Sequence, residues 1–322
     1  MDIFTHFLLG IIISIFTLNS FGFEIVLFGG IMAVIADFDI FLEPFKKFRT
    51  SNLLSHKGIS HSFFSGLLIS LPFALIFTFI TNHSFLIVWM IGFVFYGLHV
   101  ILDFMGASKI PLLFPFIKKR FRFFIDRAIN IYLALISGCF ILFYLIIFFV
   151  WPELYFSNLI FYIFGFYIVY LSYRIFTKVW IQLNLPENSH YIPGLLPFTY
   201  LIYQNQNSEN FIIYKLIKKV QFISKETKLL DSKIKNDTLE MKYFEQVLIL
   251  SKKYIFFSKW KFIFPILQKN EKIIVIILSL AESYASGRMY SLKVTFDLAT
   301  NKILNEIEGF NKKIQTMSSK NR

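Results

Sequence analysis

The sequence predicts an all-α polytopic membrane domain of about six helical segments, followed by a soluble α+β domain. Hydrophobic residues make up 56% of the 322 residues, the mean hydropathy is +0.61, and the long apolar runs stop near Pro186. Such a hydrophobic content lies outside the range of ordinary soluble domains. We therefore predict a membrane domain over residues 1–185 and a soluble domain over residues 186–322.

Six apolar segments follow one another in the first domain. Four of them are long enough to cross a hydrocarbon core of roughly 30 Å as helices, which takes about 20 residues. The first two are short and predict a tight helical hairpin that turns at Asn19 and Ser20. No Lys or Arg precedes the first segment, which argues against a cleaved signal peptide. The six segments are residues 7–18, 21–36, 63–80, 85–102, 129–151 and 156–179.

Lys and Arg predict the orientation of these segments. Residues 43–60 contain four and residues 106–128 contain six of these cations, whereas the alternate connections contain none. Loops rich in Lys and Arg face the cytoplasm. The sequence therefore predicts a multi-pass protein of the inner or plasma membrane, with both termini in the cytoplasm.

The second domain is basic, with 21 Lys or Arg and 12 Asp or Glu from Glu187 onward. Aromatic and β-branched residues over 210–223 and 289–310 predict strands, the latter pair forming a hairpin around Thr300 and Asn301. Residues 238–257 have helical spacing, and the apolar run 273–280 predicts a buried strand. The positive charge indicates contact with anionic lipid, and no nucleic-acid recognition motif is visible.

Histidine and aspartate residues occur near the ends of four apolar segments. Ionisable residues in a membrane domain are costly and indicate a functional site. With the orientation predicted above, all four positions lie on the cytoplasmic side. These residues are Asp2 and His6, Asp37 and Asp39, His56 and His61, and His99 and Asp103.

Residue spacing predicts which of these side chains can meet. His99 and Asp103 are four residues apart and share one face of a helix, as do Asp2 and His6. Asp37, in the motif ADFDIF, is two residues from the next aspartate, so at least one of the two lies in the turn after the helix.

The donor types indicate a metal site. Imidazole nitrogen with carboxylate oxygen suits a divalent metal, zinc first and manganese or iron less specifically. The single cysteine, Cys139, lies in the fifth segment, which excludes a thiolate cluster and an intrachain disulfide. More than four candidate ligands predicts two or more ions, which would hold a phosphoryl group and lower the pKa of a water molecule.

Structural alternatives exist for each residue. A histidine at a membrane boundary is commonly a hydrogen-bonded interfacial residue, and a lone aspartate such as Asp37 is commonly a polar helix end. Asp2 could be an N-terminal cap, and Asp103 could pair with Arg122. Two further histidines, His83 and His190, lie outside the cluster and are interpreted as structural.

Over residues 1–118 the motifs THFLLG, ADFDIF, HKGISHSFF and HVILDFMGASKIPLLFPF resemble those of the membrane-bound metal-dependent hydrolases. This family includes LexA-regulated inner-membrane hydrolases of bacteria. The third and fourth motifs are the more specific ones. The matching positions are Thr5, His6, Asp37, Asp39, His56, Gly58, His61, Ser62, His99, Asp103, Leu112, Leu113, Pro115 and Phe116.

The resemblance implies a distant similarity to zinc-dependent phospholipase C and zinc nucleases, which cleave phosphodiesters. Three positions depart from the family pattern: Lys57 stands for arginine, Ser60 for threonine and Lys109 for glycine. The first two changes keep a cation and a hydroxyl. The loss of the bidentate geometry of arginine alters how a phosphate or carboxylate is held.

We therefore predict a metal-dependent hydrolase that acts on a phosphoester, for example in a lipid headgroup, at the cytoplasmic membrane surface. The alternatives are a metal or proton transporter and a non-catalytic membrane scaffold. Lys57 and Ser62 are predicted to bind substrate, Asp2 is a weaker ligand candidate, and one carboxylate among Asp37, Asp39 and Asp103 is predicted to act catalytically as a general base. The predicted metal ligands are His6, Asp37, Asp39, His56, His61, His99 and Asp103.

Overall fold

The computed structural model describes residues 2–48, 57–127, 130–150, 159–254, 256–257, 260–285 and 288–311. The chain divides into two compact units, residues 1–175 and residues 176–322. We call the first the helical unit and the second the β unit. Helix α6 belongs to both, because it continues from the helical unit into the first residues of the β unit.

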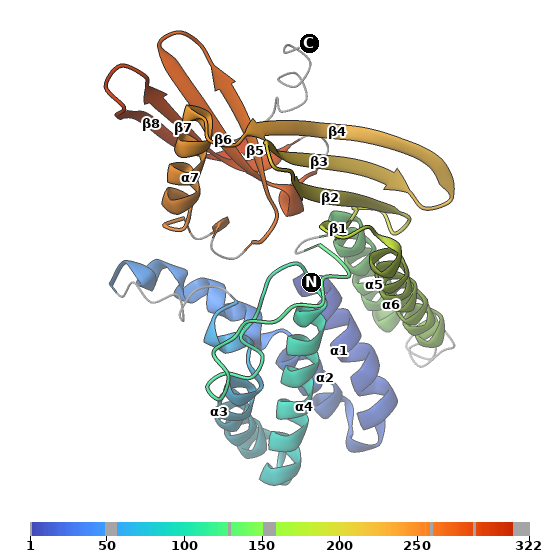
Figure 1. Ribbon diagram of the computed structural model, residues 1–322. Coiled ribbons are helices and arrows are strands. Elements are labelled where there is room, and N and C mark those ends of the chain that lie inside the picture. Colours follow the sequence, from blue (N-terminus) through green and yellow to red (C-terminus); the bar gives the residue numbers. More distant parts are fainter. Residues whose placement is uncertain are drawn as a thin grey trace. The chain divides into compact units, whose positions relative to one another are not determined.

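The helical unit is built of helices packed side by side (Figure 1). Helix α1 packs against α2 and α5, and α4 packs against α2 and α3. Each apolar run forms a helix because a helix satisfies its own backbone hydrogen bonds in a medium without water. The elements are α1 Ile3–Leu18, η1 Asn19–Phe21, α2 Phe23–Met32, η2 Ile35–Phe48, η4 Ile59–His61, α3 Phe63–Thr81, α4 Phe85–Phe104, α5 Ile131–Val150 and α6 Leu159–Asn184.

Four helical stretches in the described part of the chain are long and apolar enough to cross a membrane: Ile3–Phe21, Phe63–Thr81, Phe85–Phe104 and Leu159–Asn184. Helix α2 and the stretch Ile131–Ile147 of α5 are shorter. The prediction of six segments is therefore not confirmed as six spans. The second segment is short because α2 ends at Met32 and the chain continues as the 3-10 helix η2.

Close contact between α1 and α2 depends on glycine. A Cβ atom on Gly10 would lie 2.5 Å from the Cβ of Ala33, and one on Gly29 would lie 2.1 Å from the Oγ of Ser14. Small residues let two membrane helices approach closely. Because His6 lies one turn before Gly10 on α1, this approach brings His6 toward the residues that follow α2.

The connection between α4 and α5 folds back onto the end of α4. The amides of Phe123 and Ile125 donate to the carbonyls of Phe104 and Met105 at 2.7 and 2.9 Å. Further along this connection the buried carboxylate of Asp126 accepts hydrogen bonds from side chains of α6 and of the residue before α5. The donors are Arg174 and Tyr170, each at 2.5 Å, and Asn130, at 3.1 Å.

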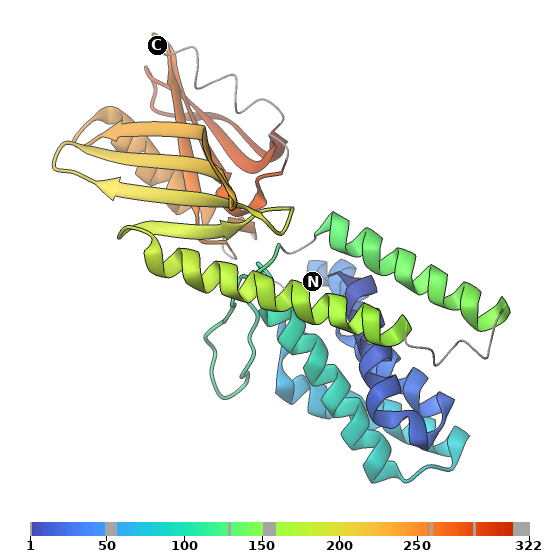
Figure 2. The ribbon, with the colours of Figure 1, turned by 90° about the vertical axis from the view of Figure 1, so that its right-hand side faces the viewer.

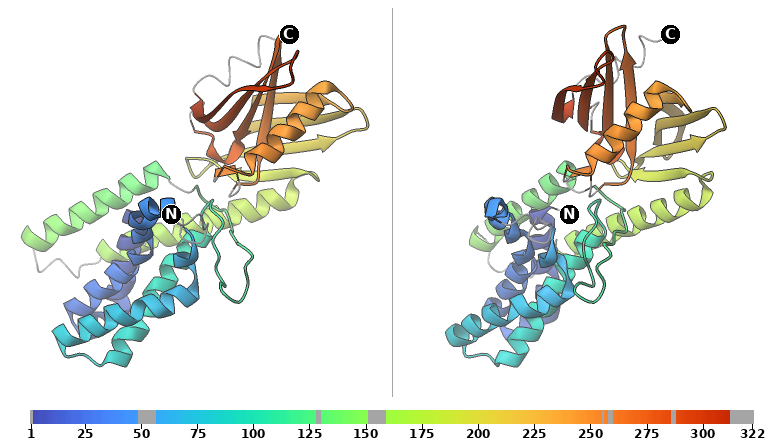
Figure 3. Two further views of the ribbon diagram at one scale, coloured as in Figure 1. Left: turned by 90° about the vertical axis from the view of Figure 1, so that its left-hand side faces the viewer. Right: turned by 60° about the vertical axis from the view of Figure 1, so that its left-hand side comes forward.

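The β unit contains two four-stranded antiparallel sheets, with strand orders β1-β2-β3-β4 and β5-β6-β7-β8 (Figure 2). Helix α7 packs against β4 and β6 (Figure 3). The hydroxyl of Tyr203 on β2 donates to the carbonyl of Ile263 on β5 at 2.7 Å and so links the two sheets. The elements are β1 Ser189–Pro193, β2 Thr199–Asn207, β3 Phe211–Val220, β4 Ile223–Lys235, α7 Leu239–Ser251, β5 Ile263–Lys269, β6 Ile273–Leu280, η6 Ala281–Ser283, β7 Met289–Asp297 and β8 Ile303–Asn311.

The predicted α+β character of this domain is confirmed only in part, because α7 is its one long helix after α6 in the described residues and strands dominate. The buried strand over 273–280 is confirmed as β6, and the hairpin around Thr300 and Asn301 is confirmed as β7 and β8. Strands such as β2 and β4 were not predicted, because their Asn, Gln and Lys side chains obscure the apolar alternation that identifies a strand.

Candidate metal centre

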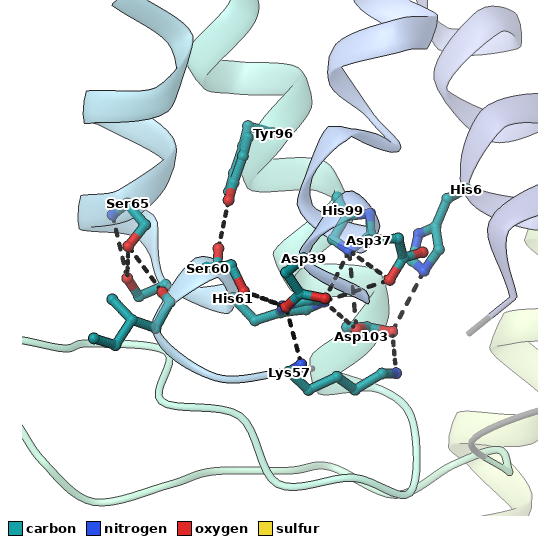
Figure 4. Close-up of polar contacts among 12 residues, drawn as sticks. His6, Asp37, Asp39, Lys57, Ser60, His61, Ser65, Tyr96, His99 and Asp103 are labelled. Atoms are coloured by element: carbon teal, nitrogen blue, oxygen red, sulfur yellow. Dashed lines mark hydrogen bonds and ion pairs between the residues drawn. The ribbon is translucent and has the colours of Figure 1, made fainter. Parts of the chain in front are cut away.

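Side chains from four segments of the helical unit meet at one end of its helices (Figure 4). Helices α1 and α3 begin at the end where α4 finishes, so antiparallel packing gathers residues that are distant in sequence. The segments contribute His6 from α1, Asp37 and Asp39 from η2, Lys57 and His61 from the loop before α3, and His99 and Asp103 from the end of α4.

Four of these residues form a compact group of donor atoms. Asp37, His61, His99 and Asp103 each offer one ligand atom, and the four atoms lie within 4.8 Å of one another. The Nε2 atom of His61 lies 3.0 Å from Oδ2 of Asp103 and 3.2 Å from Nε2 of His99. Oδ1 of Asp37 lies 3.6 and 3.7 Å from the Nε2 atoms of His61 and His99, and Oδ2 of Asp103 lies 3.9 Å from that of His99.

These separations fit a single tetrahedral metal ion. Ligand atoms about 2.1 Å from a tetrahedral centre lie about 3.4 Å from one another. Two imidazole nitrogens and two carboxylate oxygens are also a donor set that zinc and other divalent ions accept. The residues present therefore fit a divalent ion in both chemistry and spacing.

Hydrogen bonds at the opposite side of each imidazole ring orient the two histidines. The Nδ1 atom of His99 lies 2.8 Å from the carbonyl oxygen of Ala33. Because a carbonyl only accepts, Nδ1 donates, and the neutral ring then presents the lone pair of Nε2 to the group of ligands. His61 directs its Nδ1 to Oδ2 of Asp39 at 3.3 Å. This arrangement, a carbonyl or carboxylate behind a metal-binding histidine, fixes the tautomer and raises ligand basicity.

The other carboxylate oxygen of Asp103, Oδ1, contacts the side chains of Lys57 and His6. Oδ1 lies 2.9 Å from Nζ of Lys57 and 3.3 Å from Nε2 of His6. The ring of His6 stacks on the ring of His99 with centroids 4.0 Å apart. His6 and Lys57 thus contact Asp103 from the side opposite its Oδ2, which faces the ligand group.

The groups outside the membrane-spanning helices have strongly shifted pKa values. Burial disfavours the imidazolium form of His61, but the carboxylates of Asp103, Asp37 and Asp39 outweigh burial and raise its pKa to about 10. Burial alone would likewise lower the pKa of Lys57, but Asp103 raises it above its usual value. For Asp37, burial raises the pKa, yet the hydrogen bond to His61 and the nearby histidines bring it below its usual range. Without a metal ion, the cluster therefore holds a proton on His61.

Most of this group is closed to solvent, and two of its side chains are slightly exposed. The side chains of His6, His61, His99 and Asp103 are 0% exposed, whereas that of Asp37 is 12% exposed and that of Lys57 is 10% exposed. A ligand that entered the cluster from solvent would therefore meet Asp37 and Lys57 first.

Several predicted site residues lie elsewhere or have another partner. Asp2 caps α1, since its carboxylate accepts from the amide and the hydroxyl of Thr5 at 2.9 and 2.8 Å, as the structural alternative expected. Ser62 caps α3 by accepting from the amide of Ser65 at 3.2 Å, and its role in substrate binding stays a prediction. His56 lies outside the described residues.

The remaining histidines and Arg122 are also accounted for. His83 lies 3.8 Å from the carboxylate of Glu24, and the ring of His190 stacks on that of Phe262. Arg122 donates to the carbonyl of Ala107 at 2.7 Å, and the cation bound to Asp103 is Lys57.

Two supporting residues were not predicted from the sequence. Ser60 donates a short hydrogen bond to Oδ2 of Asp39, the same oxygen that accepts from the amide of Lys57 at 3.1 Å. Tyr96, on α4, donates to the carbonyl of Ser60 at 2.5 Å. Ser60 is recognisable from its position in the HKGISHSFF motif, whereas no local pattern identifies Tyr96, because its partner lies 36 residues away.

Comparison with known proteins supports a membrane location. No match was found among curated proteins or among solved structures. A family described as "YdjM inner membrane protein" matches residues 1–181, which include the described ligands and helices α1 to α5. Because this match covers more than half of the chain and agrees with its apolar helices, the chain is a membrane protein that belongs to the YdjM inner membrane protein family.

Proposed function

We propose that the protein is a metal-dependent hydrolase that holds one divalent cation, zinc first, between Asp37, His61, His99 and Asp103. The observation that carries this proposal is the convergence of four donor atoms within 4.8 Å, with both histidines oriented through their Nδ1 atoms. A bound divalent cation supplies Lewis acidity and lowers the pKa of a water molecule toward neutrality.

The net charge of the cluster supports one bound ion. The number of candidate ligands in the sequence had predicted two or more. With neutral histidines, and counting only the described side chains of the cluster, the three carboxylates Asp37, Asp39 and Asp103 outnumber the ammonium of Lys57 by two negative charges. One divalent cation would balance this excess. Lys57 Nζ, 2.9 Å from Oδ1 of Asp103, already provides the positive charge that a second ion would bring to that oxygen.

Two residues are suited to act on a substrate. Asp37 has the most exposed carboxylate of the group; released from the ion, it would leave a position for water and accept a proton from that water as a general base. Lys57 is the cation nearest to solvent in the group and would attract an anionic oxygen of the substrate. Asp39 instead orients His61, and its carboxylate is engaged by Lys57 N and Ser60.

The proposed substrate is a phosphoester, first of all in a lipid headgroup. The ligands lie at one end of apolar helices, which for helices that cross a bilayer is the level of the headgroups, and a cation beside a metal ion would suit a phosphoryl oxygen. A transporter would need ionisable residues near the middle of the bilayer. A scaffold would not need histidines oriented in this way.

The test is an assay of the purified full-length protein, loaded with zinc, on phospholipid vesicles and on a soluble phosphodiester. We expect phosphoester cleavage that Asp37→Asn lowers by about 100-fold or more, since general-base catalysis contributes about 10²- to 10⁴-fold. Glu24→Gln, which changes an exposed carboxylate at the start of α2, is the matched control and should leave the rate unchanged. Metal bound without cleavage of either substrate would refute the hydrolase and leave the metal site intact.

The proposed orientation, with site and termini in the cytoplasm, follows from the distribution of Lys and Arg. We expect an impermeant maleimide to label Asn82→Cys but not Phe116→Cys in intact cells, in a Cys139→Ser background. Both positions are exposed, Phe116 by 83%, so lysis should make both reactive. Labelling of Phe116→Cys alone in intact cells would reverse the orientation.

Metal binding should release protons and strengthen as pH rises. A ligand histidine must be neutral, whereas the pKa of His61 without metal is raised to about 10, so at pH 7 its proton must leave before Nε2 can bind a cation. Affinity should therefore increase from pH 6 toward pH 9. Calorimetry in buffers of different ionisation enthalpy measures the protons released, and an uptake of zinc with no proton release would contradict this prediction.

A further inference from the structure

Two turns at one end of the first sheet expose large apolar side chains. The β1-β2 turn carries Leu196 and Phe198, which are 36% and 41% exposed, and the β3-β4 turn carries Phe222 and Ile223, which are 78% and 58% exposed. Because the sheet is a meander, both turns lie at the same end of it (Figure 2). The amide of Gln221 donates to the carbonyl of Phe198 at 2.8 Å and ties the two turns together.

These turns lie beside helix α6, which is long and apolar enough to cross a membrane. The hydroxyl of Thr177 on α6 donates to the side-chain oxygen of Gln221 at 3.3 Å, and Thr177 is 1% exposed. On the same helix Phe176 and Trp180 are 61% and 59% exposed. The apolar turns therefore contact a stretch of an apolar helix that also carries exposed aromatic residues, including a tryptophan of the kind found at membrane interfaces.

The turns also have features that favour their transfer from water into the lipid interface. Hydrogen bonds within the chain engage backbone groups of the β1-β2 turn: the amide of Gly194 donates to the carbonyl of Thr199 at 2.9 Å, and that of Thr199 donates to Leu196 at 3.0 Å. Backbone groups paired in this way cost little to move into an apolar phase. The exposed side chain of Lys218, at the end of β3, provides a cation for anionic headgroups.

We propose that the β1-β2 and β3-β4 turns insert Leu196, Phe198, Phe222 and Ile223 into the lipid interface beside α6. The occupant of this apolar surface is then the bilayer that surrounds α6, since the turns are joined to this apolar helix by the hydrogen bond between Thr177 and Gln221. The insertion anchors the β unit to the membrane at a second point besides α6. This inference does not depend on the metal site or on the hydrolase proposal.

The test measures the depth of single nitroxide labels by electron paramagnetic resonance. Full-length protein with Cys139→Ser is labelled at Phe222→Cys, or at Leu196→Cys on the other turn, and reconstituted into bilayers of phosphatidylethanolamine and phosphatidylglycerol. The control is Phe310→Cys, because Phe310 on the edge strand β8 is also highly exposed, by 67%. Collisions of the nitroxide with molecular oxygen or with a nickel chelate report its depth. Oxygen concentrates in the bilayer, whereas the water-soluble nickel chelate does not enter it.

We expect labels at Phe222 and Leu196 to collide with oxygen several-fold more often than the label at Phe310, and to be shielded from the nickel chelate. Exposure of both turn labels to the nickel chelate at the level of the Phe310 label would overturn the proposal. Spin-spin broadening at Phe222 that disappears on dilution with unlabelled protein would also overturn it, because the occupant would then be a second copy of the chain.

Discussion

Replacement of His61 by alanine should lower metal affinity by more than about 100-fold and abolish stoichiometric binding. His61 supplies one of four donor atoms, and its Nε2 lies 3.0 to 3.6 Å from the donor atoms of Asp103, His99 and Asp37. Changing a residue that only orients a ligand already costs about 10- to 100-fold in affinity, so loss of the ligand itself should cost more. Elemental analysis of the purified protein, followed by competition with a chelating dye, measures both effects.

Two further variants distinguish the effect of losing a metal ligand from the effect of losing a residue that only supports one or lies elsewhere. Asp39→Asn should weaken binding by about 10- to 100-fold without abolishing it, because Asp39 contacts Nδ1 of His61 and not the ligand side of the ring. His83→Ala, which removes a histidine paired with Glu24, should leave metal content unchanged. If folded His61→Ala protein retained a full equivalent of zinc, the ligand assignment would be wrong.

Replacement of Arg174 by methionine should lower the free energy of unfolding by about 3 to 5 kcal/mol. Arg174 and Asp126 are 0% and 1% exposed and form an ion pair at 2.5 Å. Removing one partner of a buried pair leaves an uncompensated buried charge, which is the costly case. Reversible unfolding of the purified protein in mixed detergent micelles measures the difference between the variant and the original chain.

The matched control for Arg174 is an exposed ion pair. Lys228→Met removes one partner of the pair with Asp231 on β4, where the lysine side chain is 52% exposed, and should cost at most about 1 kcal/mol. Adding Asp126→Leu to Arg174→Met should recover part of the lost stability, because no unpaired charge then remains. A loss below about 1 kcal/mol for Arg174→Met would show that this pair does not stabilise the helical unit.

The sequence by itself determined that the protein is a membrane protein and which residues could form its site. An apolar fraction of 56% leaves few places for ionisable side chains, so histidine and aspartate near the ends of apolar runs are conspicuous. Spacing within one helix also determined that His99 and Asp103 share a face, which is confirmed by their separation of 3.9 Å. Regular helix geometry fixes such a distance before any tertiary contact forms.

Only the tertiary structure decided what each carboxylate does. Asp37 and Asp39 have the same chemistry and lie two residues apart, yet Oδ1 of Asp37 faces the Nε2 atoms of two histidines whereas Asp39 supports one ring from behind. Asp2, four residues from His6, turns instead to the amide of Thr5. Spacing cannot distinguish these outcomes, because each carboxylate takes the nearest donor that packing provides.

The close approach of helices explains why packing decides the site. The contact of Gly10 with Ala33 brings α1 against the end of α2, and the carbonyl of Ala33 then accepts from His99 on α4. Three segments that are distant in sequence are thus placed by contacts of a few ångströms, and no local pattern encodes those contacts. Composition and spacing therefore determined the candidates, whereas the fit between helices decided which candidates can bind one ion together.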